Sequence, residues 1–152
     1  NFHPDNSHVI PGLIRRIHEA KERKLPSVTA WGTGSPKREF LYVEDLAQAS
    51  VHIMDLKKNI HRIQCSENLS HINIGAGKDC SISHLIDTIV KIVGYNGEIV
   101  WDSSKPDGTP RKLMDSSKIQ SLGWSPSVSL EDGLALTYKW FLNNQEKAHC
   151  RG

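Results

Sequence analysis

The sequence predicts an α/β fold, because short apolar strands alternate along the chain with segments of helical periodicity. The clearest strand signals lie at residues 28–31 and 98–101, each next to turn-forming or polar residues. A helix between them has both ends marked, since Ser81 can cap its start and Gly94 can end it. Together these signals define a class of fold, and they leave the function open.

The remaining elements are expected in a regular order. Asn6 or Ser7 can cap a first helix, in which Pro11 falls at an early position that needs no backbone donor. Glu44 and Asp45 lie where negative charge favours the start of a second helix. The expected order is a helix after Ser7, strands at 28–31 and 40–43, a helix from Glu44, a strand at 71–75, a helix after Ser81, a strand at 98–101, a short helix ending at Gly123 and a last helix at 130–143.

Composition limits the classes of protein that the chain can represent. Its 152 residues fit one domain over residues 1–152, with a frayed tail at 145–152. The formal net charge is +2 and charges of both signs are mixed, which argues against a broad basic surface for nucleic acid. No stretch approaches the length of apolar sequence that spans a bilayer, so no membrane segment is expected.

The cysteines indicate the redox environment of the chain, and its first residue predicts that it is a piece of a longer protein. Cys65, Cys80 and Cys150 are odd in number and have no C-x-x-C spacing. This pattern favours reduced thiols in a cytoplasmic protein over a disulfide framework or a zinc site. The chain begins with Asn1 rather than Met, and we therefore expect it to be a piece of a longer protein.

The segment at residues 105–112, Lys-Pro-Asp-Gly-Thr-Pro-Arg-Lys, is the most informative motif. Two prolines and a glycine stiffen and bend this loop. It carries three cations, Lys105, Arg111 and Lys112, and one carboxylate, Asp107. Such a loop is suited to a rigid, charged ligand, for example a nucleotide sugar.

Three residues near strand ends or on the first helix are candidates for ligand contacts. Trp31 ends a strand beside a glycine-rich turn, where an indole can lie against a base or sugar ring, and a half-buried core tryptophan is the alternative. Arg38 could bind phosphate oxygens bidentately, although a lone arginine near a turn is usually solvated. Arg16 adjoins a second arginine, a pattern typical of a solvent-facing helix surface.

His8 is a candidate for proton transfer. It stands at the start of the first helix, where the positive end of the helix dipole favours a neutral imidazole. A neutral imidazole could donate or accept a proton, and a capping or surface histidine is the alternative. His3, Asp5 and His8 have no spacing that supports a metal site, so no metal is expected.

Two cofactor motifs are absent from the sequence. Gly75-Ala76-Gly77 follows an expected strand and precedes a helix, but Cys80 stands where a third glycine would complete a dinucleotide-binding loop. A Tyr-x-x-x-Lys pair is also missing, since the residues four places after the three tyrosines are Leu46, Ile99 and Leu142. The chain therefore holds no complete active site of this kind.

Several segments together resemble the extended short-chain dehydrogenase/reductase family. Residues 38–45 are similar to the strand-to-helix signature in the C-terminal half of that family, and so is the spacing from 71–75 to 122–124 and 130–134. The segments at 1–11 and 105–112 are similar to those of the NADP-dependent epimerase-reductases that convert GDP-4-keto-6-deoxy-D-mannose to GDP-L-fucose. The resemblance covers nearly the whole chain.

The resemblance implies that the chain is the C-terminal substrate-binding part of an extended enzyme with an NAD(P)-binding Rossmann-like fold. The N-terminal Rossmann half is then missing, and with it the NADP loop, the catalytic serine, the cysteine base and the Tyr-x-x-x-Lys pair. His8 matches the histidine acid of the epimerisation at C3 and C5, and it borders the nicotinamide. The positions that match the GDP-sugar contacts are Arg16, Trp31, Arg38, Asp107 and Lys112.

The resemblance also implies the partners. These are a GDP-sugar substrate and the N-terminal Rossmann half of the same protein, which would bind most of the NADP. The isolated chain is expected to be inactive, and a homodimer is expected because a strand at 71–75 would lack its neighbour. Two alternatives stay open, namely a non-catalytic nucleotide-sugar binding module and the same half of another extended epimerase or dehydratase.

Overall fold

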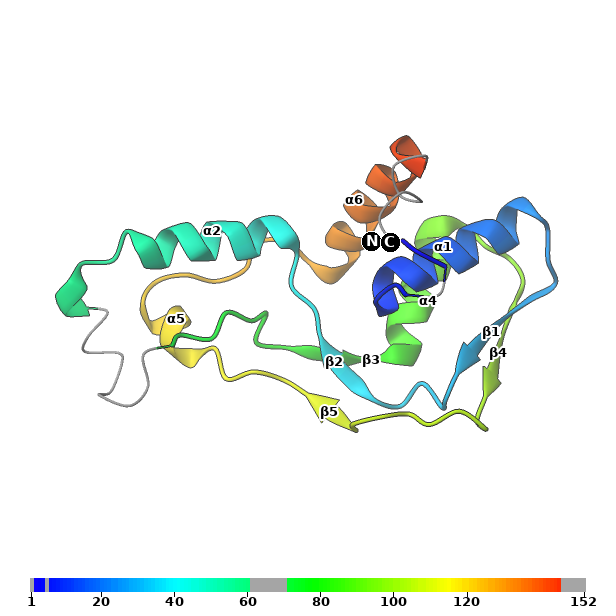
Figure 1. The fold of residues 1–152 in the computed structure, drawn as a ribbon, viewed down its shortest axis with the longest axis horizontal. Helices are drawn as coiled ribbons and strands as arrows, with labels where there is room; N and C mark the ends of the chain where they lie inside the picture. The colour runs from blue at the N-terminus through cyan, green and yellow to red at the C-terminus, as the bar shows by residue number, and fades with distance from the viewer. Residues whose placement is uncertain (1, 5, 61–70, 146–152) are drawn as a thin grey trace. The chain divides into compact units, whose positions relative to one another are not determined.

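A computed structural model describes residues 2–4, 6–60 and 71–145 of the chain (Figure 1). Predictions about Asp5, Cys65, Cys150 and most of the 145–152 tail therefore lie outside the described residues. The chain divides into two compact units that alternate along the sequence. Unit 1 contains Asn1–Pro36, Ser81–Pro110 and Glu131–Gly152, whereas unit 2 contains Lys37–Cys80 and Arg111–Leu130. One domain over the whole chain stays a prediction.

Unit 1 is built on a pair of parallel strands. Strand β1 (Ser27–Trp31) pairs with β4 (Glu98–Asp102), from Ser27 opposite Glu98 to Trp31 opposite Asp102 (Figure 1). Both strands therefore end at the same edge, and the loops that follow them begin side by side. These two strands confirm the predictions for 28–31 and 98–101.

Three helices complete unit 1, namely α1 (Val9–Glu22), α4 (Ile82–Val93) and α6 (Leu130–Asn143). Both predicted ends of α4 are confirmed, because the Ser81 hydroxyl accepts the His84 N–H at 3.1 Å and Gly94 has φ of 70°. The predicted capping of α1 by Asn6 or Ser7 is wrong. The His8 carbonyl accepts the Gly12 N–H at 3.0 Å, so His8 is the N-cap.

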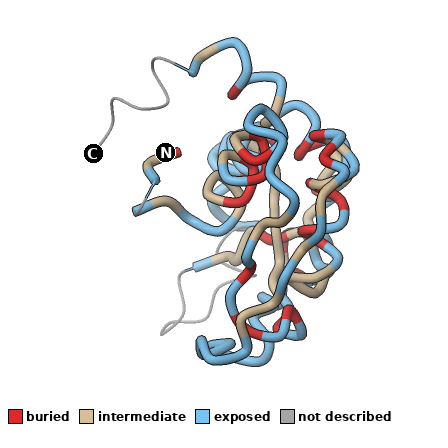
Figure 2. Tube along the Cα trace, turned by 90° about the vertical axis from the view of Figure 1, so that its right-hand side faces the viewer, coloured by how far each residue is buried: buried red, intermediate tan, exposed pale blue. Residues whose placement is uncertain are grey.

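The helices of unit 1 bury the apolar stripes that their spacing predicts. Figure 2 colours the buried residues red along the tube of the chain. In unit 1 many of the buried residues belong to α1 and α4. The fully or nearly fully buried side chains of these helices include Leu13, Ile14, Ile17, Leu85, Ile86, Ile89, Val93, Leu134 and Phe141. Leu13, Ile14 and Ile17 recur at helical spacing, and they form the inward face of α1.

Unit 2 contains short strands in the order β3-β2-β5. These are β3 (Asp79–Ser81), β2 (Lys37–Glu39) and β5 (Arg111–Lys112), and β2 pairs with β5 in parallel. The predicted strand at 40–43 is wrong, because the pairing with β5 lies earlier in the chain and Val43 already begins a helix. The predicted strand at 71–75 is also not formed, and β3 lies four residues beyond it.

The helices of unit 2 are α2 (Val43–Met54) and α5 (Ser117–Ser121). Glu44 and Asp45 lie in the first turn of α2, as predicted. A cluster of Ala49, Ile119 and Trp124 forms the core, against which Leu41, Ile53, Ile72 and Ile74 pack. Gly123, with φ of 89°, follows α5 and confirms the predicted end of the short helix.

A buried carboxylate fixes the chain that follows α5. Asp45 is 1% exposed, and it accepts hydrogen bonds from the N–H and hydroxyl of Ser127 and from the Val128 N–H at 3.0 Å. Burial alone would raise the pKa of Asp45, but the bonds from Ser127 and Val128 outweigh it and lower the pKa. The ionised side chain therefore holds two distant segments of unit 2 together.

Candidate functional site

The predicted site residues fall into two groups, one in each unit. Unit 1 carries His8, Arg16, Trp31 and Asp107, and unit 2 carries Arg38 and Lys112. Within the described residues, no cluster of three or more His, Cys, Asp or Glu side chains could hold a metal ion. No helix of this part of the chain is long and apolar enough to cross a membrane.

Trp31 is exposed at the end of β1. Its exposed fraction is 67%, which rules out the alternative of a half-buried core residue. The Lys105 ammonium lies 5.9 Å from the centroid of the indole, within the range of a cation–π contact. Because β1 and β4 end at the same edge, the turn after Trp31 and the 105–112 loop are neighbours, and an indole with an adjacent cation is available to a ligand.

Asp107 binds the turn that follows Trp31. Its Oδ1 accepts the Thr33 N–H at 2.6 Å and its Oδ2 accepts the Thr33 hydroxyl at 2.7 Å. The bond from the Thr33 N–H, followed by that from its hydroxyl, lowers the pKa of Asp107. The carboxylate is therefore ionised at neutral pH, and it holds the loop that follows β4 against the end of β1.

The turn after β1 is fixed on its other side as well. The Gly34 carbonyl accepts the Ser83 N–H at 2.9 Å and the Pro36 carbonyl accepts the Ile82 N–H at 3.0 Å, both at the start of α4. Gly34 has φ of 75°, and a Cβ there would lie 2.4 Å from Cη2 of Trp101. Only glycine permits this conformation and this close approach.

His8 and Arg16 both belong to the exposed part of α1. His8 is the N-cap residue and its imidazole makes no capping hydrogen bond. Arg16 is exposed, with a weak bond of 3.4 Å to the Gly12 carbonyl, whereas Arg15 pairs with Glu19 at 2.6 Å. Of the two adjacent arginines, Arg15 is therefore engaged inside unit 1, whereas Arg16 has no ion pair within the described residues and partial burial lowers the pKa of its guanidinium.

The strands β2 and β5 place four cations in two opposed pairs. Lys37 lies opposite Arg111, and Arg38 lies opposite Lys112. Arg111 is neutralised by Asp79 at 2.5 Å, and the bond from Arg111 lowers the pKa of that carboxyl. Because successive side chains of a strand point to opposite faces, Arg38 and Lys112 share the other face.

Arg38 and Lys112 have no ion pair with any carboxylate of the described residues. The Arg38 Nη1 donates to the Lys37 carbonyl at 2.7 Å, which holds the guanidinium close to the strand. Like charges directly opposite each other in a sheet are destabilising. A bound anion would remove this repulsion, so the pair is a candidate site for a phosphate or diphosphate.

The Gly75-Ala76-Gly77 turn is occupied by a carboxylate of the chain itself. Oε1 of Glu39 accepts the Gly77 N–H at 2.8 Å, and Oε2 accepts the Met114 N–H at 3.1 Å. A Cβ at Gly75 would lie 2.6 Å from Oε1 of Glu39. The residues of this turn therefore do not fit the phosphates of NADP, in agreement with the missing third glycine.

Two residues of the site were not found from the sequence, namely Thr33 and Glu39. Thr33 stands in a Gly-Thr-Gly turn that indicates only a bend, and its partner Asp107 is 74 residues away. Glu39 lies just before the expected strand at 40–43, and its partners are Gly77 and Met114. No local pattern identifies either contact, because both depend on segments that are distant in sequence.

Comparison with known proteins relates the chain to an enzyme family. The family described as NAD dependent epimerase/dehydratase matches residues 1–75. The GDP-L-fucose synthase of Escherichia coli (strain K12) is 55% identical over 147 residues, which are 97% of this chain and 46% of that protein. The chain therefore spans about half the length of the curated relatives that it matches.

Solved structures give the same fold. The GDP-L-fucose synthetase of Naegleria fowleri bound to NADP has a TM-score of 0.82 at 26% identity, covering 96% of this chain and 43% of that one. A GDP-mannoheptose C4 reductase from Campylobacter jejuni with NADP bound has a TM-score of 0.78 at 33% identity, covering 93% of this chain and 48% of that one. The chain has an α/β fold that matches these enzymes over about half their length.

The chain belongs to the NAD dependent epimerase/dehydratase family. Within that family it is a homologue of the GDP-L-fucose synthases.

Proposed function

We propose that the chain is the C-terminal, substrate-binding half of an NADP-dependent epimerase-reductase that converts GDP-4-keto-6-deoxy-D-mannose to GDP-L-fucose. The observation that carries the proposal is the pairing of Arg38 with Lys112 across β2 and β5. Two unneutralised cations on one face of a ladder are suited to a diphosphate. The identity of 55% to a GDP-L-fucose synthase supports a GDP-sugar as the carrier of that diphosphate.

The proposed roles follow the residues already described. Arg38 and Lys112 bind the diphosphate, Arg16 supplies a further cation, and Trp31 offers its exposed indole to a ring of the ligand. Asp107 accepts hydrogen bonds from ligand hydroxyl groups. Each of these roles is consistent with the charge and exposure of the side chain, and each can be tested separately.

His8 is proposed as the acid of the epimerisation. A proton must be delivered to carbon next to the keto group at C3 and at C5, after a base outside this chain has removed one. The exposed imidazole at the start of α1 has no capping bond to occupy it. Hydride transfer depends on NADPH, and the chain contributes no phosphate-binding loop to that cofactor. His8 bordering the nicotinamide stays a proposal.

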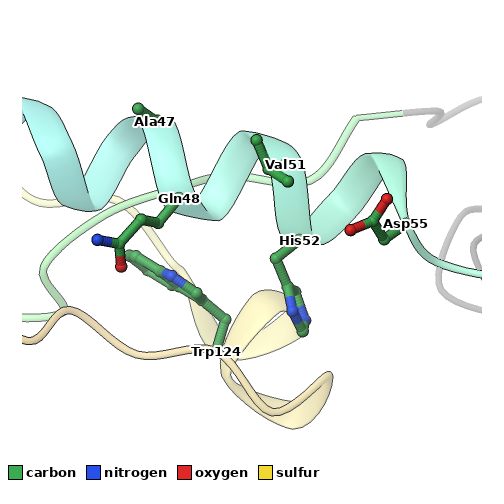
Figure 3. A pocket seen from close by; sticks show the side chains of 6 residues that line it. All are labelled: Ala47, Gln48, Val51, His52, Asp55 and Trp124. Atoms are coloured by element: carbon green, nitrogen blue, oxygen red, sulfur yellow. The ribbon is translucent and has the colours of Figure 1, made fainter.

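The exposed face of α2 supports the idea that unit 2 packs against a further part of a longer protein. Val43, Leu46, Val51 and Met54 lie on this face, and Met54 is 83% exposed. An adjoining open hollow of about 500 Å³ has a largely apolar wall, and Figure 3 shows Gln48 beside the Trp124 indole in that wall. Its lining residues are Ala47, Gln48, Val51, His52, Asp55 and Trp124. We propose that the N-terminal half covers this face.

The family match covers residues 1–75, and it favours an alternative in which the chain corresponds to the N-terminal half of its relatives. That alternative requires a dinucleotide loop, and the sequence has neither the third glycine nor a Tyr-x-x-x-Lys pair. The two positions make opposite predictions for direct binding. Titration of the chain with NADP and with GDP-mannose should give binding of the GDP-sugar alone, and binding of NADP alone would reverse the assignment.

Activity tests the remaining part of the proposal. The chain should be inactive alone with GDP-4-keto-6-deoxy-D-mannose and NADPH, and addition of the cofactor half of a GDP-L-fucose synthase should restore NADPH oxidation. If NADPH is oxidised only with a different GDP-keto-sugar, the chain would instead belong to a related reductase, such as one that acts on a heptose. A chain that binds GDP-mannose but never supports turnover would be a nucleotide-sugar binding module. A homodimer and a cytoplasmic location stay predictions.

A further inference from the structure

The loop after β4 is joined to the turn after β1 by Thr33. Residues 103–110 are exposed and contain neither helix nor strand. An exposed loop of this kind is mobile unless side chains tie it to the sheet. Two bonds from Thr33, through its N–H and its hydroxyl, reach the two different oxygens of Asp107 at 2.6 Å and 2.7 Å. The position and the rotation of that carboxylate are both fixed.

The direction of these hydrogen bonds can be assigned from their chemistry. An ionised carboxylate only accepts, so the Thr33 hydroxyl must donate its single hydrogen to Asp107. The Ser35 hydroxyl lies 2.8 Å from the Thr33 hydroxyl, and it must then be the donor of that bond. The Ser35 N–H also donates to Thr33 Oγ1, at 3.2 Å. Two groups of Thr33 thus bond to the carboxylate, and two groups of Ser35 bond in turn to the Thr33 hydroxyl.

Gly32 allows the carboxylate to approach the turn this closely. It has φ of 80°, and a Cβ there would collide with Oδ1 of Asp107. Gly32 directly follows Trp31, so the carboxylate is held next to the exposed indole. The lone pairs that Thr33 does not use, about one on each oxygen, remain available as acceptors.

We propose that Thr33 is a positioning residue, which holds the Asp107 carboxylate so that it accepts hydrogen bonds from ribose or hexose hydroxyl groups of the nucleotide sugar. The inference rests on the proposed function and deepens it. A carboxylate repels phosphate, so the diphosphate is not its partner, and we assign it to the sugar hydroxyl groups, from which it can accept. Thr33 does not touch the ligand and acts through Asp107.

Calorimetric titration of the full-length protein with GDP-mannose provides the test. Thr33→Val keeps the shape of the side chain and removes its hydroxyl, and it should weaken binding about tenfold. Thr33→Ser restores the hydroxyl and should bind within about twofold of the wild type. Asp107→Asn should weaken binding at least as much as Thr33→Val. The double variant should bind nearly as well as Asp107→Asn alone, because both changes remove the same interaction between Thr33 and Asp107.

Two further measurements separate positioning from a purely structural role. If the hydroxyl groups belong to the ribose, Thr33→Val weakens GDP and GDP-mannose equally, whereas hexose contacts leave GDP unaffected. Acid should weaken binding as Asp107 becomes protonated, and the midpoint of this loss should move to higher pH in Thr33→Val, since the bonds from Thr33 lower the pKa of that carboxyl. A lower melting temperature with unchanged affinity and midpoint would show a structural role only.

These measurements distinguish failure of this inference from failure of the proposed function. A wild type that binds neither GDP nor GDP-mannose overturns the proposed function and this inference with it. Normal wild-type binding together with Thr33→Val within about twofold overturns the inference alone. If Thr33→Val does not fold, the wild-type Thr33 amide resonance and the wild-type affinity are followed against pH. If the amide resonance and the affinity change at the same pH midpoint, the proposal is supported, and if their midpoints differ, it is overturned.

Discussion

Arg38 and Lys112 lie directly opposite each other in the parallel ladder of β2 and β5, although 74 positions separate them in the sequence (112 minus 38). The pair places two like charges on one face of unit 2, with no described carboxylate to neutralise them. Such an arrangement costs stability in the free protein. It is consistent with a site that is completed by an anion.

Removal of one cation of this pair should weaken ligand binding without loss of stability. Arg38→Ala is expected to lower the affinity for GDP by about 1.5–3 kcal/mol, the range for hydrogen bonds to charged groups. The melting temperature without ligand should stay the same or rise, because a repulsive contact is removed. Calorimetry and thermal unfolding measure both quantities. Arg23→Ala, at an exposed arginine after α1, is the matched control, and an equal loss of affinity there would contradict the role of Arg38.

Replacement of His8 should affect epimerisation before reduction. His8→Asn, in the full-length protein, is expected to slow solvent-deuterium incorporation at C3 and C5 by about 10²–10⁴-fold, the usual contribution of a positioned acid or base. NADPH oxidation should fall only as far as reduction of the substrate depends on its prior epimerisation. His84→Asn, at an exposed histidine of α4, is the control. Deuterium incorporation at the wild-type rate in His8→Asn would rule out the role of an acid.

The turn after β1 should tolerate no side chain at Gly34. Gly34→Ala combines a positive φ with a collision against the Trp101 ring, and it is expected to destabilise the protein by about 2–4 kcal/mol. Gly123→Ala separates the two effects, since Gly123 has φ of 89° but no atom within 4 Å of a Cβ placed there. The loss in Gly123→Ala should therefore be smaller, at about 1 kcal/mol. Chemical denaturation measures both, and equal losses would exclude the collision.

Acid should destabilise unit 2 through Asp45. Its folded pKa lies below the unfolded value of about 3.9, so its stabilisation is complete above that pH and is lost as the pH falls through the folded pKa. Asp45→Asn should lower the free energy of unfolding by about 1–3 kcal/mol at pH 7, because an amide nitrogen cannot accept the Val128 N–H.

The difference between the Asp45→Asn variant and the wild type should shrink as the pH falls below about 4, where the wild type loses the same interaction. Denaturation curves at a series of pH values measure it. A constant difference across that range would mean that the carboxylate charge does not contribute.

The strands β1 and β4 and the ends of α4 could be predicted from the sequence, whereas the residues at which the β2–β5 ladder forms could not. The ends of α4 follow from Ser81 and Gly94, which act on their own neighbours. Residues 40–43, Phe-Leu-Tyr-Val, have strong strand propensity, yet the ladder forms at Lys37–Glu39 because β5 pairs there. In the site, Trp31 became a candidate from its place at a strand end and Arg38 from its guanidinium, whereas the contact between Thr33 and Asp107 depends on the tertiary fold.

The alternation of the two units along the chain has a consequence for biosynthesis. Strand β1 pairs with β4 only after about 70 further residues have been made, and β2 waits equally long for β5. Unit 2 is incomplete until Leu130 has left the ribosome, and unit 1 needs α6 after that. Unit 2 can therefore close only after residues 37–130 have been made, and unit 1 only after α6 has followed them.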